Sequence, residues 1–191
     1  VDRTPDLVAA LAAAAAAGDD DLVARLLARK ADPNAAAPDR PAPLVGAAGA
    51  GALPVVERLL AAGADAKGVA GPAMSAAAPH PEVLARLVAA GAPVDARAAD
   101  GATAFLVAAS LGAVESVRWL LAHGADRAAR DGSGRDVGAT LDAGVRAAEA
   151  SIAAVRGKRG VSADDAHDVA RSEARLRGIE AVRALLAAPP K

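Results

Sequence analysis

Hydrophobic residues recur along this chain at helical spacings, and short polar turns interrupt them at regular intervals. Four apolar stretches end alike, in a Leu-Leu or Leu-Val pair followed by a short polar turn, and they close at Asp32, Asp65, Asp95 and Asp126. Their spacing, roughly 30 residues, is typical of a repeat protein. In the last three copies a Gly ends the helix, where a left-handed turn is needed. The pattern predicts stacked helix–turn–helix units, with a strained turn where Lys30 replaces this Gly.

The clearest copy carries a family motif. It reads Asp100-Gly101-Ala102-Thr103-Ala104-Phe105-Leu106, then Ala108-Ala109, Gly112, Leu120-Leu121 and Gly124-Ala125-Asp126. At this period, the motif resembles the ankyrin repeat. The resemblance implies an all-α ankyrin-repeat solenoid of about five helix–turn–helix repeats, with finger loops along one rim and a concave protein-binding face. We expect a single domain over residues 1–191, with repeats at about 4–34, 35–67, 68–97, 98–128 and 129–188.

The last repeat departs from this pattern, with an insertion at about residues 145–177. Apolar residues at steps of three and four (Leu141, Val145, Ala148, Ile152 and Val155) predict one helix from about 135 to 156. A second stripe predicts a partner helix from about 163 to 187, so that the two form an extended C-terminal helical hairpin. In the alternative, Gly144 and Gly178 break these helices and the insertion folds back.

Composition narrows the possible functions. Hydrophobic residues make up 53% of the chain but aromatic residues only 1%, which predicts a core of Ala, Leu and Val. A net charge of −1 and the scarcity of aromatic residues for base stacking argue against nucleic acid and anionic membranes as partners. The run Leu7–Ala17 lacks the basic flank of a signal peptide and is too short to span a membrane. We expect a cytoplasmic protein, and the bias to Ala, Arg, Gly and Asp suggests a bacterial source.

The surface expected to bind a partner comprises the finger loops, the concave face and the tip of the hairpin. The connector after Asp65 is the shortest and would leave a notch near Lys67–Gly71, although we favour simple drift in loop length as the explanation, because loops tolerate such changes. Aromatic, Met and Arg side chains carry much of the binding energy at interfaces, which favours Trp119 and Met74 slightly. The candidate contacts are Arg40, Lys67, Met74, Arg97, Asp100, Arg130, Arg156, Lys158 and Arg159.

One polar cluster offers an alternative site. Asp164, His167, Asp168 and Arg171 lie at spacings of three and four and share a helix face. A metal site needs three or four ligands, from more than one element as a rule, and no second His cluster completes this one. A salt-bridged solvent face is the simpler interpretation. No phosphate-binding loop is present either, so we predict no catalytic residue, metal or cofactor.

These observations favour a scaffold that binds a protein partner, acts as an inhibitor, immunity or regulatory protein, and is a monomer without enzymatic activity. The alternative is a small-ligand or metal-binding protein, or an enzyme, that uses a polar pocket formed by the C-terminal insertion. Self-association through the hairpin stripe is a third possibility.

Overall fold

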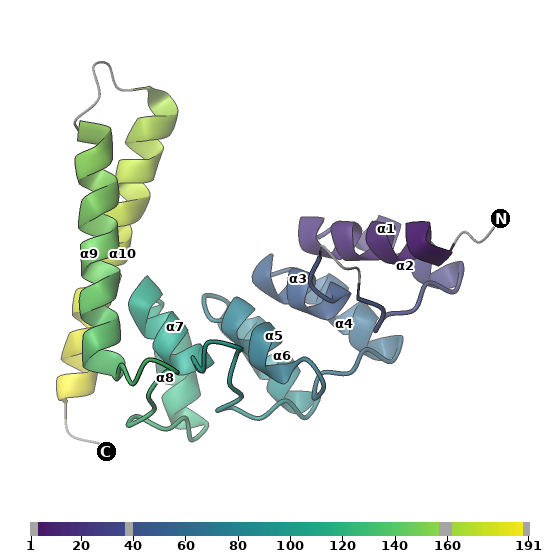
Figure 1. Cartoon of the computed structure of the whole chain (residues 1–191), viewed down its shortest axis with the longest axis horizontal. Coiled ribbons are helices and arrows are strands. Elements are labelled where there is room, and N and C mark those ends of the chain that lie inside the picture. Colours follow the sequence, from purple (N-terminus) through teal and green to yellow (C-terminus); the bar gives the residue numbers. More distant parts are fainter. Residues whose placement is uncertain (1–3, 37–39, 157–161, 189–191) are drawn as a thin grey trace. The chain divides into compact units, whose positions relative to one another are not determined.

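The computed structural model describes residues 4–36, 40–156 and 162–188, and these residues form ten helices and no strands (Figure 1). The all-α class expected from the sequence is confirmed. The chain divides into two compact units, residues 1–99 and 100–191. The repeat boundaries and the single-domain extent stay predictions.

The first unit contains three helix pairs. They are α1 (Thr4–Ala17) with α2 (Asp20–Ala28), α3 (Pro43–Gly49) with α4 (Leu53–Ala61), and α5 (Ala70–Ala76) with α6 (Pro81–Ala89). Helix α3 packs between α1 and α5, and α4 packs between α2 and α6, so the helices form two rows. Because the first row is rich in Ala and Gly, its helices approach closely, while Val and Leu of the second row supply most of the larger core side chains. The largest buried side chains are Leu11, Val23, Leu44, Val55, Leu59, Met74, Leu84 and Leu87.

Each second-row helix ends in the same hydrogen-bonded turn. After α4, the N–H of Ala64 donates to the carbonyl of Leu59 at 2.9 Å and the N–H of Gly63 donates to that of Leu60 at 3.1 Å. This paired arrangement needs a left-handed residue after the helix, and Gly63 supplies it with a φ of 92°. Lys30 occupies the equivalent position after α2 with a φ of 66°, as the only non-Gly residue with positive φ among the described residues. The strained turn predicted from the sequence is confirmed.

Polar contacts join successive pairs of the first unit. Arg58 on α4 donates from Nε and a terminal amino group to both carboxylate oxygens of Asp20 on α2, each at 2.6 Å, and these hydrogen bonds lower the pKa of Asp20. Asn34 donates to the carbonyl of Gly63 at 2.9 Å and accepts from the N–H of Asp65 at 2.7 Å. The turn after α2 is thereby fixed to the turn after α4.

The second unit begins with a short helix pair, α7 (Ala104–Leu111) and α8 (Val114–Ala122), and ends with two long helices, α9 (Val137–Arg156) and α10 (Ala163–Ala187). Helices α9 and α10 run side by side, and the C-terminal half of α9 and the N-terminal half of α10 extend past the end of α7 (Figure 1). The two long helices expected from the sequence are confirmed, and the folded-back alternative is wrong.

Two glycines that could have broken these helices instead allow close packing. A Cβ on Gly178 of α10 would lie 2.3 Å from the carbonyl oxygen of Gly112, in the turn between α7 and α8. A Cβ on Gly144 of α9 would lie 2.5 Å from the carbonyl oxygen of Ser110. Because both obstacles are backbone atoms, only Gly fits at either position. Gly144 also corrects the predicted apolar stripe, since it is buried on α9 while Val145 is only half-buried.

We expect Lys30→Gly to stabilise the protein by about 0.5–1 kcal/mol, because it relieves the left-handed strain without losing a backbone hydrogen bond. Thermal unfolding would then shift upward by roughly 2–4 °C. The reverse change, Gly63→Lys, is the matched control, because nothing lies within 4 Å of a Cβ there. Equal melting temperatures for wild type and both variants would show that the turn is unstrained.

Gly178→Ala and Gly144→Ala should each lower the free energy of unfolding by at least about 1 kcal/mol, although Ala favours helix formation. Gly138→Ala is the control on α9, since its Cβ would meet only the Asp136 side chain, at 3.4 Å; we expect it to be neutral or stabilising. Chemical denaturation followed by circular dichroism measures all three variants. Stabilisation by Gly178→Ala would contradict the backbone contact with Gly112.

Candidate functional site

The finger loops begin with a local turn built by the closing aspartate of the repeat. The carboxylate of Asp32 accepts the N–H of Asn34 at 2.9 Å, that of Asp65 accepts the N–H of Lys67 at 3.0 Å, and that of Asp126 accepts the N–H of Ala128 at 2.8 Å. Aspartate favours such turns because its side chain reaches the backbone two residues ahead. The base of each of these fingers is therefore fixed by its own sequence.

In the second unit, the finger between α8 and α9 packs against the segment that precedes α7. The N–H of Gly132 donates to the carbonyl of Asp100 at 2.8 Å. A Cβ on Gly101 would lie 2.5 Å from the backbone nitrogen of Gly132. The two backbones are in direct contact, and the absence of side chains at both glycines makes this contact possible.

Asp131 organises the end of the same finger. Its carboxylate accepts the N–H of Ser133 at 2.8 Å, and the N–H and Nε of Arg135 at 3.0 and 2.7 Å. Desolvation acts to raise the pKa of Asp131, but the hydrogen bonds from Arg135 and Ser133 outweigh it and hold the pKa below its usual value. The Asp131 side chain is only 7% exposed. This finger is rigidly built, with Arg135 engaged through its Nε.

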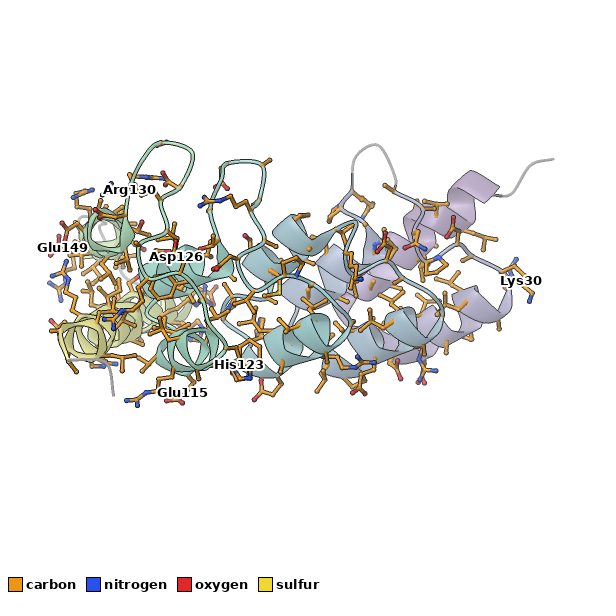
Figure 2. All side chains as sticks on the ribbon, turned by 90° about the horizontal axis from the view of Figure 1, so that it is seen from below. Lys30, Glu115, His123, Asp126, Arg130 and Glu149 are labelled. Carbon is orange, nitrogen blue, oxygen red and sulfur yellow. The ribbon has the colours of Figure 1, made fainter. Side chains whose placement is uncertain are left out.

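Arg130 supports the finger from the other side. It donates to the carbonyl of Gly134 at 2.7 Å and lies 3.2 Å from the carboxylate of Asp136. Asp136 also accepts the N–H of Ala139 at the start of α9, and this backbone hydrogen bond is the main reason that its pKa is lowered. Figure 2 shows Arg130 at the loop edge of this unit, with Glu115 and His123 at the opposite edge.

A cavity of about 230 Å³ lies between α7 and α9, below this finger. Its volume suits one amino-acid side chain rather than an extended ligand. Arg175 of α10 lines it and donates from Nε to the carbonyl of Ser110, at the end of α7, at 2.9 Å. The wall is half apolar and half polar, formed by Asp100, Ala102, Leu106, Val107, Ser110, Asp131, Arg135, Thr140, Ala143, Gly144 and Arg175.

Most of the candidate contacts chosen from the sequence are accessible. The exposed ones are Arg40, Lys67, Arg97, Asp100, Arg130 and Arg156. Met74 is corrected: it is 0% exposed, because its side of α5 faces the core rather than the concave surface, and we withdraw it from the set. Lys158 and Arg159 lie outside the described residues.

The notch expected near Lys67–Gly71 is also corrected in part. Helix α5 begins at Ala70, so Gly71 is helical and buried. A Cβ on Gly71 would lie 2.0 Å from the carbonyl oxygen of Arg97, which shows that the next connector packs against α5 at this point. The short connector therefore makes room for backbone of the same unit, and only its Lys67 end is left as open surface.

The alternative polar cluster has the geometry of a solvated helix face. Asp164, His167, Asp168 and Arg171 are all exposed, and Arg171 lies 3.6 Å from Asp168 one turn away. Over residues 4–36, 40–156 and 162–188, no group of three or more His, Asp or Glu side chains is placed to hold a metal ion. The cavity below the finger is lined by other residues.

The candidate contacts chosen from the sequence include Asp100 and Arg130, which stay predictions, but not Asp131, Arg135 or Arg175. The spacing of four between Asp131 and Arg135 was a readable signal of an ion pair. Arg175 gave no such signal, because its position depends on the register at which α10 packs against α7. The contact between Gly178 and Gly112 sets that register.

Comparison with known families agrees with this architecture. Residues 44–131, which run from α3 to the finger after α8, match the family model described as ankyrin repeats (3 copies). These residues are ankyrin repeats. No curated protein matches the sequence. Ankyrin repeats are generally protein–protein interaction modules. In the part of the chain that the structure describes, no helix is both long and apolar enough to cross a membrane.

Acid should loosen the ankyrin finger around Asp131. A depressed carboxylate pKa means that the stabilisation is complete above the ordinary aspartate value, about 3.9, and is lost as pH falls through the lower folded value. We expect the NMR signals of Arg135 Nε–H and of the Ser133 N–H to titrate with a midpoint below pH 3.9. In Asp131→Asn this titration should disappear. A midpoint at or above that of a free aspartate would contradict the hydrogen-bonded finger.

Proposed function

We propose that this chain is a scaffold that binds a protein partner through its finger loops and concave helix faces, as an inhibitor, immunity or regulatory protein. The observation that carries the proposal is a set of fingers whose backbones are fixed while charged side chains on them are exposed. Preorganised loops lose little conformational entropy on association, which favours affinity. In this proposal the chain has no enzymatic activity and is a monomer in the bacterial cytoplasm.

The fingers carry charges of both signs: Arg40, Lys67 and Arg97 are basic, and Asp100 and Asp126 are acidic. A mixed pattern favours a partner with an equally mixed surface, because like charges opposite one another are costly. It disfavours a polyanion as the principal ligand. Typical interfaces also concentrate their binding energy in a few side chains, so single finger substitutions should have measurable effects.

The test is site-specific photo-crosslinking in native cells. Benzoylphenylalanine would be placed at Arg97, Asp100 and Arg130 on the fingers, and at Glu115 and Arg118 on the exposed face of α8 as matched controls. We expect one protein to be captured from the finger positions and not from the α8 positions. With that protein purified, Arg97→Ala should weaken binding by about tenfold or more, and Arg118→Ala should leave it unchanged. Capture from α8 alone would overturn the proposed binding face.

A further inference from the structure

The cavity below the last finger is lined by four charged groups, two acidic and two basic, and Arg175 is the less exposed of its two arginines. Asp131 already accepts three hydrogen bonds from Ser133 and Arg135, and its side chain is nearly buried. Arg135 donates a hydrogen bond from its Nε to Asp131, and its side chain is 55% exposed. Asp100 is exposed and uses one oxygen on the N–H of Ala102 at 3.0 Å.

Arg175, the more buried of the two arginines, is held from outside the finger. Its Nε donates to the carbonyl of Ser110, and this part-buried contact fixes the plane of the guanidinium group. Within the described residues, the two terminal amino groups of Arg175 make no hydrogen bond or ion pair. A guanidinium held in place, with its terminal N–H groups available, matches the two oxygens of a carboxylate.

The walls beside Arg175 fit a short aliphatic stem. Val107 and Ala143 lie on the facing helices, and Gly144 contributes no side chain. The volume, about 230 Å³, admits one side chain of the size of Asp or Glu. The Asp100 and Asp131 carboxylates also line the cavity, and a doubly charged anion would meet about twice the Coulomb repulsion from them that a singly charged one meets. Charge balance therefore favours a carboxylate over a phosphate group.

We infer that the cavity between α7 and α9 receives an aspartate or glutamate side chain of the protein partner, whose carboxylate binds the terminal amino groups of Arg175. This inference rests on the proposed function, since it names the chemistry of one contact in that interface. Arg175 comes from the long hairpin, so the hairpin takes part in recognition rather than serving only to close the stack.

The first test needs no variant. N-acetyl-glutamate amide and its neutral isostere N-acetyl-glutamine amide would be titrated into the ¹⁵N-labelled full chain at constant ionic strength, with inorganic phosphate as a third probe. We expect saturable shifts of Arg175 Nε–H and of the Val107 and Ala143 amides with the glutamate probe only, with half-saturation on the order of 10 mM. Equal shifts with the glutamine probe would overturn the inference, and so would tighter binding of phosphate.

Variants show whether the glutamate probe binds in this cavity. Ala143→Leu should fill the cavity without changing charge and abolish the shifts, while Ala147→Leu, at an exposed position of the same helix outside the cavity, should preserve them. Arg175→Gln should abolish them, and Arg177→Gln, at an exposed site outside the cavity, should not. Persistence of the shifts in Ala143→Leu would show that the probe binds elsewhere. Melting curves confirm that each variant is folded.

The partner captured by crosslinking separates the two proposals. If Ala143→Leu weakens its binding about tenfold or more and Ala147→Leu does not, the carboxylate contact belongs to the interface. If the partner binds Ala143→Leu as tightly as wild type, this inference fails while the scaffold function stands. If the probe binds but no finger-captured partner exists, the scaffold function fails and the inferred partner contact fails with it.

Discussion

Helix α10 reaches the turn between α7 and α8 only because neither Gly112 nor Gly178 carries a side chain. A Cβ on Gly178 would lie 2.3 Å from the Gly112 carbonyl oxygen, which is far inside any tolerated contact. Once these backbones touch, the register of α10 is set, and Arg175, nearly one helical turn earlier, meets the carbonyl of Ser110. Farther along, Arg183 pairs with Asp142 of α9, and Arg127 donates to the carbonyl of Leu186 at 2.7 Å. The glycine contact therefore fixes both the docking of the hairpin and the place of the Arg175 guanidinium.

Positions that require a residue without a side chain recur in the fold, and they explain which features could be predicted from the sequence. The repeat period and the helix-ending glycines predicted the helix pairs, because a left-handed turn tolerates few other residues. Lys30 was predicted to be strained for the same reason, and its φ of 66° confirms this. A stripe with steps of three and four cannot say which of two adjacent residues faces a neighbour. That is why Gly144, rather than Val145, turned out to be buried on α9.

Prediction of the site was less complete, because a side chain's role depends on neighbours distant in the chain. The exposure of Asp100 and Arg130 was predictable, since connector residues generally lie on the surface, whereas Asp131 of the same finger is nearly buried. Met74 was misplaced, because its position on a short first-row helix does not reveal whether it faces the core or the concave surface. Arg175 could not have been found, since 65 residues separate it from Ser110 and only the packed hairpin brings them together.

Rigidity and recognition compete for the same charged residues in the last finger. The shape of the loop is held by hydrogen bonds that Asp131, Arg135 and Arg130 make within it. A donor group that is used within the loop is not available to a partner. A finger built in this way presents a fixed outline, and part of its donor capacity is used within the loop. An element outside the loop can add further donors. In the proposed interface the lengthened α10 supplies such a donor, Arg175, and this gives the largest departure of the chain from a regular repeat a role in recognition.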